Sequence, residues 1–432
     1  MLDRIGVRDV GELFSGIPGD IRVRGPLDLP EPLSEMEVLA ELDRLADGNR
    51  KLVCFAGGGA YDHFSPSIVD TIVSRPEFYT AYTPYQAEVS QGTLQAIYEF
   101  QSLVCRLFDM EVSNASMYDC ASALAETTHL ARDAAGRSRV LVSAGVNPAH
   151  REVVATYARG LDIPIEPVPL SGDVTDDRRL AAMLGGDVAA VVVQHPNYLG
   201  SIEPVHRIAE VAHAAGALLT VSVDPISLGV LAPPGAYGAD IAVAEGQSLG
   251  IPLSYGGPYV GLLAARKQFI RRMPGRIVAR TTDAAGRTGY VLALQTREQH
   301  IRREKATSNI CTNQALVALA AGVYLSVMGR EGIKAVAVQC LARAKYLADA
   351  IAALPGFGLI NRAPFFKEFT VSTPVPAADI VTAGLDRGFL AGIDLGRYDA
   401  EWQNRLLVAV TEKRNRKEMD AFVDFLRPFG GR

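Results

Sequence analysis

Asp224 has the residue type and the position of a ligand-binding carboxylate. It directly follows LLTVSV (218–223), an apolar run of the kind that is buried within a parallel sheet. A loop and a second apolar run (240–243) come next, and a glycine-rich return ends at Gly261. Because ligands of open α/β sheets collect beyond the carboxyl ends of the strands, we expect a binding site within residues 217–261.

A missing lysine distinguishes this region from a complete cofactor site. Enzymes that use pyridoxal phosphate (PLP) pair a carboxylate with the pyridine nitrogen and form a Schiff base with a lysine after the next strand. Here Gln247 or Ser248 stands where that lysine would be, and no lysine directly follows the second run. The sequence therefore predicts a vestigial Asp224, no covalent anchor and no cofactor bound by this chain.

A second feature argues against cofactor binding. Asn114 and Ser116 are suited to cap the start of a helix, and a helix N-terminus at this position holds the phosphate in PLP folds. Asp119 would then lie in the first turn, where its charge suits the helix dipole but repels a dianion. An ordinary helix end with a well-placed charge gives the same pattern.

The segment 79–95 is rich in side chains that could line a small polar pocket. Tyr82 and Tyr85 flank a proline that stiffens the chain. Glu88 and Gln91 follow them and could supply hydrogen bonds to a ligand. Aromatic packing beneath a loop is the alternative interpretation.

A loop with three consecutive glycines precedes Tyr61 and His63. Glycines permit positive φ angles and close approach of the backbone to a neighbour or a ligand. A tight turn and a ligand-binding loop are both consistent with this pattern.

Composition excludes several classes of function. The 432 residues carry a net charge of -5, with 48% hydrophobic and 21% charged residues, as in ordinary globular proteins. Two glutamates interrupt the only dense basic run, 297–305, so we expect no nucleic-acid binding. The five cysteines form no CxxC pair, so we expect neither a metal site nor a disulfide framework. The N-terminus lacks an apolar signal core and the longest apolar run, 316–328, is too short for a membrane span, which predicts a cytoplasmic protein without membrane contact.

The order of elements predicts an α/β protein. From residue 139 strands and helices alternate, which specifies right-handed βαβ units and a mostly parallel sheet. Three short runs from Gly261 onward, GLLAA, RIVAR and YVLAL, with an intervening AAGRTG turn, predict a short antiparallel excursion. We therefore expect an N-terminal arm (1–60), a large domain (61–330) and a small C-terminal α/β domain (331–432).

Three helices have boundaries that the sequence indicates. Apolar spacing predicts a short amphipathic helix over 7–14, and Ser34 is suited to start another. A third helix is expected to be capped by Thr312 and to stop at Gly329.

Five segments of the chain carry a family resemblance. They are AYTPYQAEVSQG (81–92), NAS (114–116), QHPNYLG (194–200), PLSYGGP (252–258) and LQTREQHIRREKATSNICT (294–312). Together they resemble glycine decarboxylase, the P-protein of the glycine cleavage system, and within that family the α-type subunit. The resemblance covers most of the first three quarters of the chain. It implies an α/β fold of the aspartate-aminotransferase type (PLP fold type I) with a mostly parallel sheet in the large domain.

The resemblance also implies a two-subunit enzyme, an α2β2 assembly in which a β-type subunit holds PLP. That enzyme decarboxylates glycine and passes the aminomethyl group to the lipoyl arm of the H-protein. The α-type chain would complete the substrate pocket of its partner across the interface. The candidates for that pocket are Tyr61, His63, Tyr82, Tyr85, Glu88, Gln91, Arg297, His300, Arg303 and Lys305.

Two other functions are consistent with the same residues. A non-catalytic subunit could stabilise its partner or dock the lipoyl carrier without touching the substrate. A self-sufficient PLP enzyme would need a lysine near the site, and Lys267 and Lys305 are both misplaced for that role.

Overall fold

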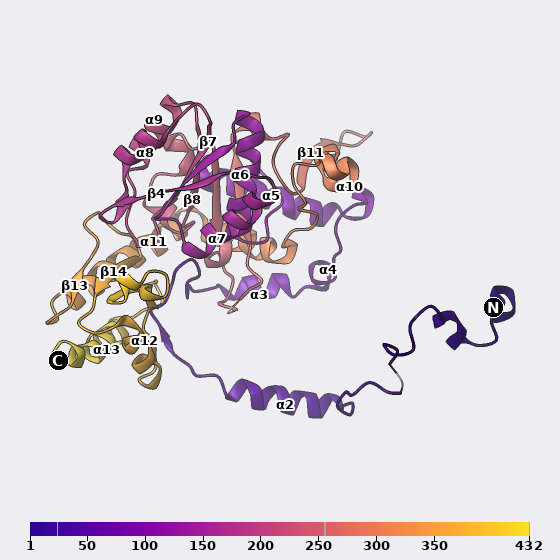
Figure 1. The fold of residues 1–432 in the computed structure, drawn as a ribbon, viewed down its shortest axis with the longest axis horizontal. Helices are drawn as coiled ribbons and strands as arrows, with labels where there is room; N and C mark the ends of the chain where they lie inside the picture. Colours follow the sequence, from indigo (N-terminus) through magenta and orange to yellow (C-terminus); the bar gives the residue numbers. More distant parts are fainter. Residues whose placement is uncertain (24, 255, 432) are drawn as a thin grey trace. The chain divides into compact units, whose positions relative to one another are not determined.

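The computed structural model describes residues 1–23, 25–254 and 256–431, which form two compact units (Figure 1). The first unit, Met1–Lys51, contains α1 (Leu2–Ile5) and α2 (Glu35–Asp47). Ser34 caps α2 as expected, and the side chain of Glu37 closes a capping box with it. The helix expected over 7–14 is wrong, because only a single 3-10 turn forms there, at Val10–Phe14. Tyr255 of the glycine-rich segment lies outside the described residues.

The second unit begins at Leu52 and is built on a seven-stranded sheet with the order β2-β10-β9-β8-β7-β3-β4. Its strands are β2 (Val112–Ser113), β3 (Arg139–Ser143), β4 (Ile165–Val168), β7 (Val188–His195), β8 (Leu218–Val223), β9 (Ile241–Glu245) and β10 (Gly261–Ala265). The run from β4 to β9 is parallel, whereas β10 is antiparallel to both of its neighbours. This sheet confirms the predicted fold class.

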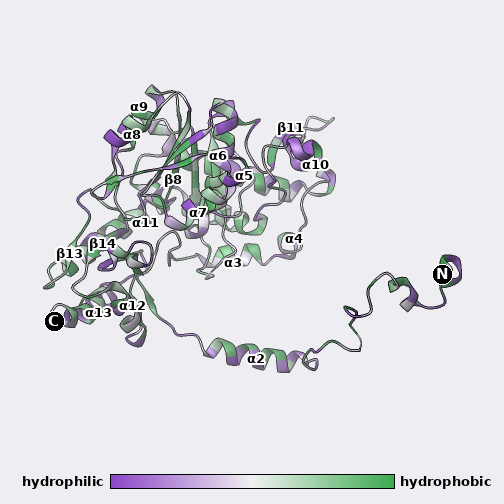
Figure 2. Cartoon of the chain, in the orientation of Figure 1, coloured by the Kyte–Doolittle hydropathy of each residue, from purple (hydrophilic) through white to green (hydrophobic). Residues whose placement is uncertain are grey.

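Each central strand supplies side chains to a core on both faces of the sheet, because successive residues of a strand point in opposite directions. Val191 and Val193 of β7 enter one core, whereas Ala190 and Val192 enter the other. The first core is covered by α5 (Gln91–Phe108), α9 (Val205–Ala214) and α11, and the second by α6 (Cys120–Ala135) and α7 (Pro148–Arg159). Figure 2 shows the resulting hydrophobic colouring of the central strands.

Shorter elements complete the second unit. The antiparallel excursion expected after Gly261 is the hairpin of β11 (Ile277–Thr282) and β12 (Thr288–Ala293). The remaining short elements of this part are α3 (Ser67–Val73), α4 (Pro76–Tyr79), β5 (Leu170–Ser171), β6 (Val174–Thr175), α8 (Asp177–Met183) and α10 (Gln299–Arg302).

Helix α11 (Ala315–Ala352) joins the large sheet to the C-terminal part. The expected stop at Gly329 is a kink with φ 55°, after which the helix continues, so the apolar helix is longer than predicted. By length and composition α11 could cross a membrane, yet it packs here into two cores. The cap is also displaced, because the helix starts after Gln314 and not after Thr312.

The C-terminal part has its own sheet, in the order β13-β14-β17-β16, and its own core. Its elements are β13 (Gly358–Leu359), β14 (Glu368–Ser372), α12 (Ala377–Asp386), β15 (Phe389–Leu390), β16 (Ile393–Asp394), β17 (Arg405–Ala409) and α13 (Arg416–Leu426). The first strand of the second unit, β1 (Val53–Cys54), pairs with β15, and Phe55 is buried in the same core. The compact unit thus starts before the expected boundary at residue 60, and α11 crosses the expected boundary at residue 330.

Candidate functional site

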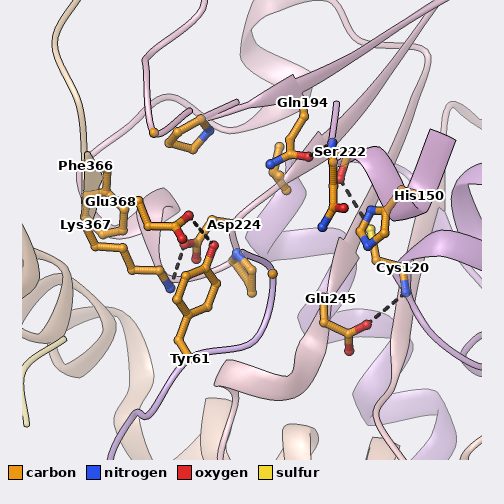
Figure 3. A pocket seen from close by; sticks show the side chains of 16 residues that line it. Tyr61, Cys120, His150, Gln194, Ser222, Asp224, Glu245, Phe366, Lys367 and Glu368 are labelled. Atoms are coloured by element: carbon orange, nitrogen blue, oxygen red, sulfur yellow. Dashed lines mark hydrogen bonds and ion pairs between the residues drawn. The ribbon is translucent and has the colours of Figure 1, made fainter. Parts of the chain in front are cut away.

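A small cavity lies at the carboxyl ends of β8 and β9, where Asp224 and Glu245 stand (Figure 3). Its opposite wall is the segment that leads into β14, which contributes Phe366, Lys367 and Glu368. The cavity volume is about 40 Å³. Since one water needs about 10–15 Å³ of such volume, the cavity has room for only a few waters.

Asp224, the residue expected to be vestigial, is paired with a lysine of its own chain. The ammonium of Lys367 lies 2.6 Å from Asp224 Oδ2, and the lysine side chain is only 1% exposed. The same ammonium stands 3.5 Å from the centre of the Tyr61 ring (Figure 3). The carboxylate that would hold a pyridine nitrogen is therefore already neutralised by a buried ion pair.

The ion pair continues into a chain of hydrogen bonds. Lys367 Nζ lies 2.9 Å from His63 Nε2, and His63 Nδ1 lies 2.6 Å from Glu412 Oε2. Because an ammonium only donates, Nε2 accepts, and the ring hydrogen must be on Nδ1, which donates to Glu412. Burial, followed by the charge of Lys367, lowers the pKa of His63, which agrees with a neutral imidazole.

Glu412 ends this chain as a carboxylate. Burial acts to raise its pKa, but hydrogen bonds from His63 and from the Phe64 backbone outweigh burial and lower the pKa to about 2. The four side chains of Asp224, Lys367, His63 and Glu412 thus connect the end of β8 with the C-terminal part of the chain.

The residue at the missing lysine's position has a structural role. The amide of Gln247 accepts from Tyr61 N at 2.7 Å and donates to the carbonyl oxygens of Tyr61 and Ile251. The Tyr61 hydroxyl donates to Glu368 at 2.6 Å, and burial raises the pKa of Glu368 to about 7. Tyr61 and His63 are therefore occupied by contacts within this chain, and Ser248 is buried.

Two carboxylates occupy the N-terminus of α6, where a phosphate would bind. Asp119 is the N-cap and accepts from Ser122 N at 2.7 Å, and Glu245 accepts from Cys120 N at 3.0 Å. The helix cap expected at Asn114 and Ser116 is wrong, because the chain beyond them is still extended and bridges to β10. Backbone N–H groups that could hold a phosphate are thus taken by acids of this chain.

These residues do not fit PLP. The cavity is too small, the carboxylate for the pyridine nitrogen is paired with Lys367, the lysine position holds Gln247, and acids occupy the helix N-terminus.

Cofactor labelling gives a direct test of this conclusion. When PLP is added to the isolated chain and the mixture is reduced with borohydride, we expect no adduct on Lys367, because its ammonium is buried and ion-paired. Peptide mass spectrometry locates the reduced pyridoxyl group, and exposed Lys267 reports the background labelling. A stoichiometric adduct on Lys367 would contradict the conclusion.

A second, larger cavity of about 230 Å³ lies beside the predicted tyrosine segment. Tyr82 lines it and is 82% exposed. Tyr85 is half exposed, and its hydroxyl accepts from Arg276 Nη2 at 2.9 Å. Gln91 is instead structural, because its amide exchanges two hydrogen bonds with the backbone of Tyr290 in β12. Glu88, in the same tyrosine segment, is exposed and does not line the cavity.

The basic motif at 297–305 is not a solvated helix face, because it is divided between α10 and two 3-10 turns. His300, Arg303 and Lys305 are exposed. Arg297 is partly buried, donates from Nη1 to the Met273 carbonyl, and has a pKa that burial lowers. The motif therefore contributes one inward-facing guanidinium.

The sequence analysis missed the residues that complete both cavities. Lys367 and Glu368 close the first, Glu412 is joined to Lys367 through His63, and Arg276 reaches the second, with Glu298 buried beside it. A lysine and a glutamate inside the apolar run FFKEFTVS were the available signal, since charged residues are rarely buried unless they are paired. Arg276 offered no comparable signal.

Comparisons with known proteins agree on one family. The family model described as glycine cleavage system P-protein matches residues 1–426. The chain is 52% identical over 427 residues to a probable glycine dehydrogenase (decarboxylating) subunit 1 of Moorella thermoacetica, covering 99% of this chain and 96% of that protein. It is 53% identical over 431 residues to the protein of the same description from Prosthecochloris aestuarii, with the same shares covered.

Solved structures give the same result. A crystal structure of glycine decarboxylase (P-protein) of the glycine cleavage system, in inhibitor-bound form, matches with a TM-score of 0.91 and 44% identity, covering 99% of this chain and 97% of that one. A C-DES mutant with glycine covalently linked to its PLP cofactor matches with a TM-score of 0.65 and 16% identity, over 89% and 98% of the two chains. The second likeness shows the fold alone.

Proposed function

Since this chain belongs to the glycine cleavage system P-protein family, we propose that it is subunit 1 of a glycine dehydrogenase (decarboxylating) and acts together with a PLP-holding β-type subunit. One observation of the chain itself carries the proposal: its own cofactor site is closed by the Asp224–Lys367 ion pair. A chain that cannot hold the cofactor contributes to the reaction through an assembly.

In the assembly, PLP on the partner supplies the electron sink for loss of CO2 from glycine. The role that we assign to this chain is to complete the pocket around the substrate. Tyr82 and Tyr85 are the candidates, because their rings are exposed beside a cavity and Pro84 between them is buried. Glu88 is a candidate at the rim, and Arg297 with its exposed basic neighbours is a further one. Tyr61, His63 and Gln91 leave this set, because their side chains are held inside the chain.

The partners, substrate and cellular location that we propose are those implied by membership of the family. The partners are a β-type subunit in an α2β2 enzyme, the lipoyl H-protein as acceptor of the aminomethyl group, and glycine as substrate. We place this enzyme in the cytoplasm, and we propose no contact with nucleic acid or membrane. The net charge of -5 supports the absence of nucleic-acid binding.

A non-catalytic scaffold subunit is the second candidate, and the closed cavity is equally consistent with it. The two functions differ in what the exposed tyrosine segment does. A scaffold tolerates conservative changes in that segment, whereas a pocket wall does not.

Reconstitution with a β-type subunit tests the proposal. We expect Tyr85→Phe to lower glycine–bicarbonate exchange roughly tenfold, because a hydrogen bond to a charged group such as the 2.9 Å bond from Arg276 is worth about 1.5–3 kcal/mol. Glu88→Gln should also lower the rate. Tyr398→Phe, another partly exposed tyrosine outside this cavity, is the matched control and should leave the rate unchanged. Full activity of both Tyr85→Phe and Glu88→Gln would favour the scaffold.

A further inference from the structure

Buried polar atoms without hydrogen-bond partners gather on three residues, Arg276, Arg297 and Glu298, of which Arg276 lines the second cavity. Among the described residues, thirteen buried side-chain atoms lack a partner, and five of them belong to Arg276, Arg297 and Glu298. A buried polar atom that has lost water and gained no partner is costly, so such atoms are uncommon in folded proteins. Their concentration here indicates a site that is completed by a ligand.

Arg276 is more deeply buried than Arg297. It is 3% exposed, yet only its Nη2 has a hydrogen-bond acceptor, the Tyr85 hydroxyl. Nη1 has no partner, and Nε lies 4.0 Å from Glu298 Oε2, which is too long for a hydrogen bond. The guanidinium is thus removed from water with the Glu298 carboxylate 4.0 Å away and the Tyr85 ring centre 5.2 Å away, but with two of its nitrogens lacking a hydrogen bond.

The backbone holds Arg276 rigidly. Gly275 before it has φ +71°, and a Cβ there would stand 3.1 Å from Asn114 Nδ2, so this position favours glycine. The Arg276 carbonyl accepts from Ala115 N at 2.8 Å, and Gln101 fixes the following strand through two hydrogen bonds with Val278. The guanidinium is therefore preorganised and does not depend on a mobile loop.

The cavity next to this guanidinium suits a small carboxylate. Its walls include Phe78 and the buried ring of Phe100, which limit the access of water to a bound group, and the exposed ring of Tyr82. A guanidinium matches the geometry and charge of a carboxylate and binds it with strong, charge-assisted hydrogen bonds. The volume of about 230 Å³ admits a molecule of a few heavy atoms but leaves little room for a large one.

We propose that Arg276 binds the carboxylate of the small amino-acid substrate, glycine, in the assembled enzyme. This inference rests on the proposed function and adds the residue that recognises the substrate's carboxylate. Arg276 forms no covalent bond and moves no proton in this role. Tyr85 is the positioning residue, because its hydroxyl holds Nη2 in place.

The chemistry of decarboxylation gives this role a kinetic signature. The ion pair with Arg276 is strongest while the carboxylate carries its full charge, and it weakens as neutral CO2 leaves. An interaction that stabilises the ground state more than the transition state contributes to binding and not to the rate of the bound complex. Loss of Arg276 is therefore expected to raise KM while kcat stays the same or rises.

The test uses the enzyme assembled from this chain and a β-type subunit, with Arg276→Met and Arg276→Lys variants. We expect Arg276→Met to raise the KM for glycine roughly 10- to 100-fold, as for loss of a hydrogen-bonded charge, with kcat not reduced. Arg276→Lys, which restores a charge without the planar fork, should recover part of the affinity. Arg271→Met changes an exposed arginine that lines a different cavity and should leave KM unchanged.

Two inhibitors separate the carboxylate from the amine of the substrate. Acetate inhibition should weaken in Arg276→Met by the same factor as the KM rises, whereas methylamine inhibition should not change. A fall in kcat at unchanged KM would overturn the proposal. Failure of the variant to co-purify with its partner in the wild-type ratio would also overturn it, because Arg276 would then bind the partner and not the substrate. An inactive wild-type assembly would overturn the proposed function, and this inference with it.

Discussion

Replacing Lys367 with methionine is expected to lower the free energy of unfolding of the isolated chain by about 3–5 kcal/mol. The substitution leaves the Asp224 carboxylate without its ammonium 2.6 Å away, in a site where the lysine side chain is 1% exposed. It also removes the donor to His63 Nε2. An uncompensated buried charge is among the most destabilising changes that a single substitution can make. The loss is measured from the shift of the urea unfolding midpoint, at constant slope.

A double-mutant cycle isolates the ion pair from the loss of packing. Lys367→Met combined with Asp224→Asn should be clearly more stable than Lys367→Met alone, because no charge is then left unpaired. Asparagine keeps an oxygen that can accept from Ile226 N, as Asp224 Oδ1 does. Lys267→Met, at an exposed lysine, is the matched control and should cost little. A Lys367→Met chain as stable as the wild type would contradict the assignment of this pair as a buried, interacting one.

The second large effect is a loss of stability with rising pH, which we expect between about pH 6.5 and about pH 9. Burial raises the pKa of Glu245 to about 8 and those of Glu126, Glu203 and Glu368 to about 7, from 4.5. Between 4.5 and these values the folded chain binds more protons than the unfolded chain, so the free energy of unfolding decreases with pH. Each carboxyl contributes at most about 1.4 kcal/mol per pH unit within its own window. Burial lowers the pKa of four histidines, His63 and His129 and, to about 4, His150 and His195, and these oppose the trend only below their ordinary pKa of about 6.5. Glu412, whose pKa is lowered to about 2, stays ionised throughout and does not alter this trend.

Urea midpoints measured between pH 5 and pH 9 test this expectation. The decrease should end near pH 9, about one unit above the pKa of Glu245, where all four carboxyls are ionised in both states. Glu245→Gln should flatten the curve most between pH 8 and pH 9, where the three carboxyls with pKa values of about 7 are mostly ionised and Glu245 still titrates in the folded chain. Glu88→Gln, at an exposed carboxyl, should leave the curve unchanged. Stability that rises with pH over this interval would show that these glutamates are ionised in the folded protein.

The strands of the large sheet could be predicted almost to the residue. The runs RVLVS and LLTVSV are β3 and β8 with the same ends, because a continuous apolar run between polar turns is a local property of the chain. Helix ends were less predictable. Asn114 and Ser116 have the chemistry of a cap, but a bridge from Met117 to Gly261 keeps this stretch extended, and the helix starts at Asp119 instead. Likewise Gly329 bends α11 without ending it, because both halves of the helix are packed into cores.

The sequence by itself predicted a cofactor site without its lysine, since Gln247 and Ser248 follow β9 and the absence of a residue type can be read directly from the chain. It also determined the parallel sheet, through periodicity that each segment carries alone. Only the tertiary structure decided that Lys367 neutralises Asp224 and that Arg276 is buried beside Tyr85 with donors left free. The physical reason is that a charge acquires its role from partners a few ångströms away in space, and those partners come from segments that the fold alone brings together.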